Sequence, residues 1–175
     1  MGRRIVYWIP GLVLVLSCAL AAQKLPDHYI EIDGAKTPEQ IPEHIMWSTG
    51  FETIALLTSK GITRDGPLAA LTLSSGDRQL LLAEVARYKE RREGCHTRGA
   101  RIAAAMDGQA VERIEAAMRA NTLECRTAML ESIDRLLLDM TPDGRLTLTT
   151  WMLNERRKVR SVMPKADLDF YRLPR

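Results

Sequence analysis

The sequence predicts an all-α protein, a small helical bundle built around a long antiparallel helical hairpin, with an extended N-terminal arm. Alanine, leucine, methionine, arginine and glutamate are plentiful and aromatic residues make up only 5%, which favours helix because straight-chain residues lose little rotamer freedom there. Apolar residues between positions 77 and 160 recur three and four residues apart, the period of an amphipathic helix. Glycine, proline and capping residues divide this stretch into segments of helix length.

The chain after its first residues begins with an extended arm, residues 23–36. Tyr29 to Gly34 has β character and ends in a turn signal. Because no second strand is predicted, we expect this arm to pack on helices without a partner. The first helix begins near Thr37 or Pro42, since the motif at Thr37 fits a capping box with proline at the first helical position. Lys60-Gly61 ends this helix.

The two central segments are predicted to form the hairpin. One helix starts near Asp77, and a turn at Asp107-Gly108 joins it to a helix over residues 109–139. Each of Gly94 and Gly99 costs about 1 kcal/mol against alanine in a helix, so the sequence permits a kink or a break between them. The two apolar stripes comprise Leu81, Val85, Tyr88, Cys95, Ile102 and Met106 on the first helix and Val111, Ile114, Met118, Cys125, Met129, Ile133, Leu136 and Met140 on the second.

The C-terminal part is predicted to contain one more helix and a tail. Thr141-Pro142-Asp143 caps this helix, which reaches about Val159. Met163-Pro164 stops it, and residues 164–175 form an irregular tail in which Leu168, Phe170 and Tyr171 are candidates to dock on the bundle. Asn121-Thr122 is a further point at which the preceding helix could be interrupted.

The first 22 residues have the pattern of a signal peptide. Arg3 and Arg4 form a basic region, residues 5–16 are apolar, and Ala19-Leu20-Ala21 supplies the small-x-small site of a signal peptidase. We predict cleavage after Ala21 or Ala22 and a periplasmic or secreted protein. Two alternatives are a retained membrane anchor and lipidation at Cys18, because residues 15–18 resemble a bacterial lipobox.

Removal of this leader leaves a single helical domain over residues 37–163, flanked by the arm and the tail. The formal net charge of +3 includes Arg3 and Arg4, and residues 1–22 contain no acid. The exported chain is therefore near neutral, which argues against a general attraction to nucleic acid or to an anionic membrane.

Two cysteines, Cys95 and Cys125, remain after cleavage. An exported chain meets an oxidising compartment, which favours a disulfide between them. In a hairpin centred on Asp107-Gly108, Cys95 lies four positions nearer the turn than Cys125. This difference corresponds to about 6 Å along a helix. The bond therefore requires a turn centred nearer position 110 or a kink at the glycines. The alternative is a pair of buried free thiols that pack as small apolar groups.

The sequence contains no motif for catalysis, metal binding or a cofactor. His28, His44 and His96 occur without His-x-x-x-His or Cys-x-x-Cys spacing, which makes a metal site improbable. Gly-x-Ser-x-Gly and phosphate-binding loops are absent from the sequence. We therefore predict no catalytic, metal-binding or cofactor-binding residues, and a protein that is not an enzyme.

Two dense basic runs cover residues 87–92 and 156–158. Glu90, Glu93 and Glu155 interleave with them, which favours a solvated helical face with i,i+4 pairing. The alternative is a site for acidic partners or lipid head groups.

Four methionines lie on or beside the helix predicted over residues 109–139. They either fill the core or form an adaptable surface that binds varied clients. The candidate binding surface consists of Met106, Met118, Met129 and Met140, together with Trp47 and Trp151.

Two of the predicted helix starts carry similar motifs. Leu73-Ser74-Ser75-Gly76-Asp77 and Met140-Thr141-Pro142-Asp143-Gly144 resemble the paired motifs of the Spy-like (LTxxQ) family of small periplasmic stress proteins. The resemblance covers residues 71–160 and implies an all-helical, curved, often dimeric protein that binds unfolded clients or senses envelope stress. The sequence departs from the motif at its closing glutamine, which is Asp77 in one copy and Gly144 in the other. Both copies also fit ordinary N-caps.

These observations together predict an exported helical protein that acts by binding rather than by catalysis. A periplasmic chaperone-like or envelope-stress protein is the most concrete version. The alternative is a structural or scaffold component of the envelope, which could be lipid-anchored at Cys18. Its partner is expected to be a protein or an unfolded client, a homodimer is compatible with this, and membrane contact would come only from the signal or a lipid anchor.

Overall fold

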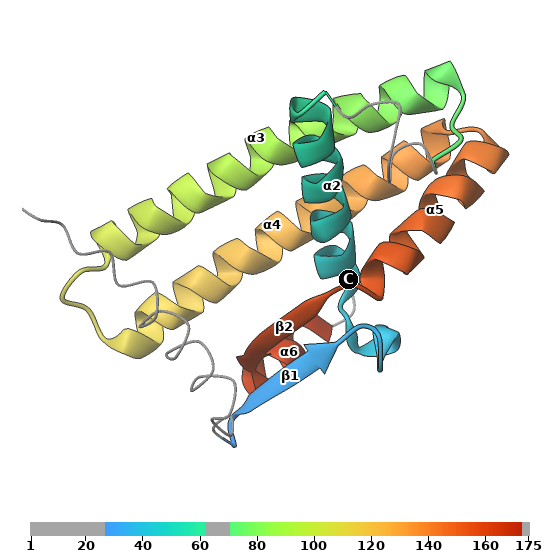
Figure 1. Ribbon diagram of the computed structural model, residues 1–175. Helices are drawn as coiled ribbons and strands as arrows, with labels where there is room; N and C mark the ends of the chain where they lie inside the picture. The colour runs from blue at the N-terminus through green and yellow to red at the C-terminus, as the bar shows by residue number, and fades with distance from the viewer. Residues whose placement is uncertain (1–26, 62–70, 173–175) are drawn as a thin grey trace, which may run out of the picture.

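The all-α class and the long antiparallel hairpin are confirmed by the computed structural model, which describes residues 27–61 and 71–172. Two long helices lie side by side, and a shorter helix crosses them (Figure 1). The whole predicted signal sequence, including Cys18, is therefore outside the described residues, as are positions 23–26 of the arm. The elements are β1 (Tyr29–Asp33), a 3-10 turn η1 (Pro38–Gln40), α2 (Glu43–Ser59), α3 (Ser75–Ala105), α4 (Val111–Asp139), α5 (Pro142–Arg156), β2 (Arg160–Pro164) and α6 (Lys165–Arg172).

The hairpin of α3 and α4 is continuous on both sides of its turn. Gly108 has a φ of 77°, a backbone conformation that glycine adopts without steric cost, which explains the tight connection. α3 passes through Gly94 and Gly99 without a break, and α4 passes through residues 121–122. The possible breaks did not form because the packed faces of the two helices outweigh the local helix propensities.

The main core lies where α2 and α5 pack against one end of the hairpin. Phe51 and Ile54 of α2, Ile133 of α4 and Met152 of α5 are fully buried in it. The two shorter helices approach closely at Gly50, where an added Cβ would lie 2.2 Å from the sulfur of Met152. The parts of the predicted α3 and α4 stripes at this end of the hairpin therefore face a common core, whereas Val111, near the turn, is 63% exposed.

The starts of α3 and α5 meet in a group of polar residues that we call the cap junction, consisting of Ser74, Asp77, Thr141 and Gly144. The Ser74 hydroxyl accepts a hydrogen bond from the Asp77 N–H at 3.1 Å and caps α3. The Thr141 hydroxyl accepts from the Gly144 N–H at 3.1 Å and caps α5. Thr141 in turn donates its N–H to Asp77 Oδ1 at 2.9 Å and its hydroxyl to Asp77 Oδ2 at 2.7 Å.

Asp77 is buried at the centre of the cap junction. Its pKa is lowered below the ordinary 3.8, chiefly because the backbone N–H and the hydroxyl of Thr141 stabilise the carboxylate. An added Cβ on Gly144 would lie 2.4 Å from Asp77 Oδ2, so glycine is required there. The two positions at which the sequence departs from the LTxxQ motif thus contact each other.

The extended arm was predicted to lack a partner strand, and this was wrong. β1 pairs antiparallel with β2, with Ile30 opposite Met163 and Ile32 opposite Ser161. Where the chain after α5 returns to the arm, Gly34 approaches the backbone of Arg156 so closely that a Cβ there would lie 2.1 Å from its carbonyl oxygen, so the contact requires glycine. A second, smaller core beneath this sheet contains Ile32, Ile41, Val159, Met163 and Leu168.

Two further predicted boundaries require correction. Of the two predicted starts of the first helix, Pro42 is confirmed, since it is the N-cap of α2. Thr37 makes no side-chain cap; its hydroxyl instead donates to the carbonyl of Asp33, and only a 3-10 turn lies between it and α2. α5 ends at Arg156 instead of reaching Val159, because Val159 is buried in the second core and the chain becomes strand.

The C-terminal tail was predicted to be irregular, but residues 165–172 form α6. Leu168 docks in the second core as expected. The Arg119 guanidinium of α4 lies 5.8 Å from the centre of the Phe170 ring, which helps to hold α6 on the hairpin. Residues 173–175 and the side chain of Tyr171 are outside the described part of the chain.

Candidate functional site

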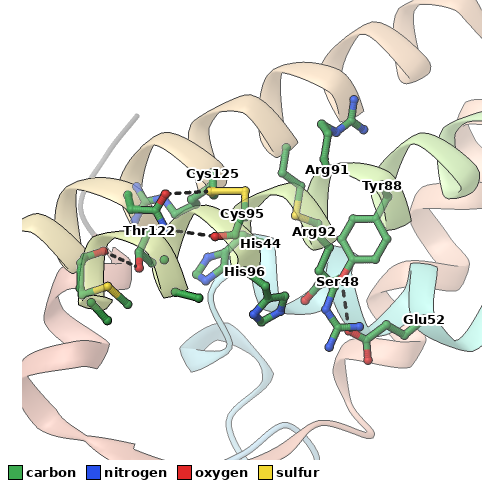
Figure 2. Close-up of a pocket in the computed structure, with 17 residues that line it drawn as sticks. His44, Ser48, Glu52, Tyr88, Arg91, Arg92, Cys95, His96, Thr122 and Cys125 are labelled. Carbon is green, nitrogen blue, oxygen red and sulfur yellow. Dashed lines mark hydrogen bonds and ion pairs between the residues drawn. A yellow bond between two sulfur atoms is a disulfide. The ribbon is translucent and has the colours of Figure 1, made fainter. Parts of the chain in front are cut away.

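An open cleft of about 590 Å³ lies where α2 crosses the hairpin, and we call it the three-helix cleft. Figure 2 shows His44, Ser48 and Glu52 of α2 facing Tyr88, Arg92 and His96 of α3. Residues of α4, from Met118 to Met129, complete its wall. The three α2 residues are four positions apart, so they lie on one face of that helix.

Glu52 gathers the polar groups at one side of the cleft. The Tyr88 hydroxyl donates to Glu52 Oε1 at 3.2 Å, and the Arg92 guanidinium lies 2.9 Å from the same oxygen. Burial, followed by the neighbouring Glu52 carboxylate, raises the pKa of Tyr88 to about 12. Tyr88 therefore stays protonated, whereas Arg92 and Glu52 keep about half of their side-chain surface in contact with solvent.

Arg91 is held beside the cleft by a buried carboxylate, Glu84. Glu84 is 1% exposed and also accepts hydrogen bonds from Ser132 at 2.7 Å and from Arg87 at 3.0 Å. The Nε atom of Arg91 is buried without a hydrogen-bond partner among the described residues, although its Nη2 contacts Glu84. This network fixes α3 against α4 and holds the Arg91 guanidinium at Glu84, at the edge of the cleft.

His44 and Arg126 lie on the side of the cleft formed by α2 and α4. Arg126 is buried, and its Nη1 donates to the carbonyl of Phe170 in α6 at 3.2 Å. Burial, followed by the positive charge of Arg126, lowers the pKa of His44 to about 4. His44 is therefore neutral at physiological pH.

Small and flexible residues line the part of the cleft nearer the hairpin turn. Gly99, Ala100 and Ala103 of α3 face Met118 of α4, with Met129 further along that helix. A Cβ added to Gly99 would lie 3.4 Å from the Met118 methyl carbon. The absence of large side chains on this stretch of α3 leaves the cleft open.

Cys95 and Cys125 form a disulfide in the wall of the cleft, as predicted. Their Cα atoms are 6.2 Å apart. α3 ends at Ala105 and α4 begins at Val111, so the two cysteines lie at unequal distances from the turn in unbroken helices. An axial offset of about one helical turn between α3 and α4 compensates for this difference, about 6 Å. The Asn121 side chain reinforces the crossing by donating to the carbonyl of Cys95 at 3.4 Å.

The residues that we predicted to form one binding surface lie in different parts of the structure. Trp47, Trp151 and Met140 are at most 7% exposed and belong to the main core, so their place in that surface was wrong. They are buried because α2 and α5 cover the end of the hairpin. Met118 and Met129 do line the cleft, whereas Met106 lies outside it, just after α3.

The basic run at residues 87–92 is paired differently from the prediction. Its partners are Glu84, one turn or more before it, and Glu52 on another helix. In the second run, Arg156 donates through Nε to the carbonyl of Ile41 at 3.0 Å. The charge pattern could have indicated Arg91 and Arg92, but their place in a cleft depends on α2, which lies far away in the sequence.

Comparisons of this chain with protein-family models, with curated proteins and with solved structures find no match. Within residues 27–61 and 71–172, no three His, Cys, Asp or Glu side chains come together in a way that could hold a metal ion. No helix in that part of the chain is both long enough and apolar enough to cross a membrane.

Proposed function

We propose that this protein is exported by means of residues 1–22 and acts by binding a compact, largely apolar ligand in the three-helix cleft. The observation that supports this most strongly is the cleft itself. Its volume of about 590 Å³ is in the range of ligand sites, which are mostly apolar with a few placed polar groups.

Several features of the cleft support binding over catalysis. Both sulfur atoms in its wall are joined in the disulfide, so neither cysteine provides a free thiolate. The Ser48 hydroxyl donates to the carbonyl of Ile45, at 3.1 Å, instead of being presented to a base. His44, with a pKa of about 4, is a weak base at neutral pH.

Binding in the cleft can be tested with the neutral fluorophore 1-N-phenylnaphthylamine, which becomes bright in apolar sites. The protein purified after expression with its own leader should bind it saturably. Ala103→Phe fills the cleft from α3 and should abolish the signal, whereas Ala104→Phe adds the same ring outside the cleft lining and should not. Equal signals from both variants, or no saturable binding to the unsubstituted protein, would contradict the proposal.

Export has a test of its own. The mass of the protein recovered outside the cytoplasm should correspond to a chain that begins at Ala22 or Gln23. Recovery only inside the cell with the leader intact would contradict this part of the proposal.

A second candidate function is the binding of unfolded protein clients, in line with the Spy-like resemblance. Leu146 and Leu153 of α5 are 67% and 52% exposed, and their spacing of seven residues puts them on one face of the helix. This function predicts that the protein suppresses aggregation of an unfolded client without ATP and that Leu146→Gln with Leu153→Gln weakens the effect. Inactivity at molar excess over the client would remove this candidate.

A further inference from the structure

We infer that the three-helix cleft selects an anionic amphiphile, a ligand with one carboxylate or phosphate head group and a single apolar tail. The inference rests on the proposed function and specifies the ligand class of the same site. It follows from two properties of the cleft, an excess of cationic groups on one side and an apolar channel towards the hairpin turn.

The cationic groups outnumber the acids around the cleft. Arg91, Arg92 and Arg126 line it, and among the described lining residues Glu52 is the only carboxylate. Arg91 is engaged by the buried Glu84 behind it, whereas the partner of Arg92 is Glu52, which itself lies in the lining. A ligand anion here gains charge-assisted hydrogen bonds, and guanidinium groups suit carboxylate and phosphate oxygens particularly well.

Arg92 is the group best placed to receive a head group. It is half exposed, and among the described residues its ion pair is with the equally exposed Glu52. Such a pair contributes little to stability, so the guanidinium can turn towards a ligand at small cost. The imidazoles of His44 and His96 lie on the same side of the cleft (Figure 2).

The apolar channel runs from this cationic side towards the turn of the hairpin. Arg92 and Ala103 both line the cleft and are eleven positions apart on α3, about 16 Å along the helix axis. Between them the lining includes the disulfide and the small residues Gly99 and Ala100, with Met118 opposite. Burial of each methylene group of a tail here contributes about 0.8 kcal/mol in general, so a tail as well as a head group should be needed.

The inference can be tested by titration calorimetry with four decyl compounds that share one tail. Decanoate and decyl phosphate should each bind one molecule per protein, about tenfold more tightly than decanol, and decyltrimethylammonium should bind most weakly. Comparison of decanoate with decyl phosphate shows which anionic head group is preferred, and binding of either compound supports the inference.

Variants separate the head-group site from the tail site. Arg92→Gln should weaken decanoate binding about tenfold and leave decanol unchanged, because only the anion loses a partner. Arg101→Gln removes the same charge from α3 outside the cleft lining and should have no effect. Ala103→Phe should weaken all decyl compounds, and Ala104→Phe none.

The outcomes distinguish this inference from the proposed function. Decanol binding as tightly as decanoate, or a loss with Arg101→Gln equal to that with Arg92→Gln, would overturn the anion selectivity but not the cleft as a binding site. Saturable binding of the neutral fluorophore without binding of any decyl compound would also overturn the inference alone. Absence of both would remove the proposed function as well.

Discussion

The cap junction and the three-helix cleft both gather polar side chains on the hairpin, but they use them in opposite ways. In the cap junction, Asp77 is 3% exposed, and hydrogen bonds from Ser74 and Thr141 satisfy its carboxylate. Gly144 leaves no room there for even a methyl group. In the cleft, Arg92 and Glu52 are half exposed beside an open volume. The buried, fully hydrogen-bonded side chains of the cap junction stabilise the fold, whereas the half-exposed side chains of the cleft can exchange their partners for a ligand.

The largest expected effect comes from removing the disulfide in the wall of the cleft. Cys95→Ala with Cys125→Ala releases a loop with a sequence separation of 30, which should cost about 3–4 kcal/mol of unfolding free energy. Urea unfolding of the two proteins measures the difference. Dithiothreitol should destabilise the unsubstituted protein to a similar extent and leave the variant unchanged. A loss confined to the experimental error would mean that α3 and α4 are held together without this bond.

A methyl group in the cap junction should have the next largest effect. Gly144→Ala places a Cβ 2.4 Å from an Asp77 oxygen, and the resulting displacement should cost about 2–3 kcal/mol of unfolding free energy. Gly76→Ala is the matched control, because its added Cβ would meet nothing nearer than 3.9 Å. In an Asp77→Ala background the cost of Gly144→Ala should shrink. Equal effects of the two glycine substitutions would show that the junction tolerates the extra volume.

The two regions should also differ in the pH range over which they contribute to stability. His44 has a folded-state pKa of about 4 against 6.5 in the unfolded chain, so the unfolded state takes up a proton first as the pH falls. Stability should therefore be lost between pH 6.5 and 4, by about 2 kcal/mol after allowance for the partial exposure of the ring. The carboxylate of Asp77 has a lowered pKa, so its contribution is complete above pH 3.8 and is lost only at lower pH.

Denaturant unfolding at a series of pH values measures this difference. His44→Gln should reduce the loss of unfolding free energy between pH 6.5 and 4 and leave the loss at lower pH unchanged. A profile that is unchanged by this substitution would show that His44 titrates normally in the folded protein.

The smallest expected effects concern the two glycines inside α3. Gly94→Ala should stabilise the protein by up to about 1 kcal/mol, since an added Cβ there meets nothing within 4 Å and alanine favours helix. Gly99→Ala should give a similar or slightly smaller gain because its Cβ would contact Met118 at 3.4 Å in the cleft. The difference between the two melting temperatures measures this contact. A strong destabilisation by Gly99→Ala would mean that the cleft is more tightly packed than its geometry indicates.

Much of the fold could be predicted from local sequence patterns. The stripes of α3 and α4, the glycine turn at residue 108 and the caps at Ser74 and Thr141 depend on residues a few positions apart. These signals are short-range because hydrogen bonds within a helix and its caps join neighbours. The cysteine pair was also predicted, although its geometry required an offset between the helices that the sequence does not reveal.

Only the tertiary structure decided which of these residues meet. The partner of β1 lies more than 120 positions away in β2, and the three-helix cleft combines α2, α3 and α4, whose facing residues have no fixed spacing in the chain. Burial of Trp47 and Trp151 likewise depends on how α2 and α5 cross. The sequence by itself determined the capped starts of α3 and α5 and the apolar faces of the long helices, because those features depend on neighbouring residues. The packing of these faces then determined which polar groups became buried and which were left around an open cleft.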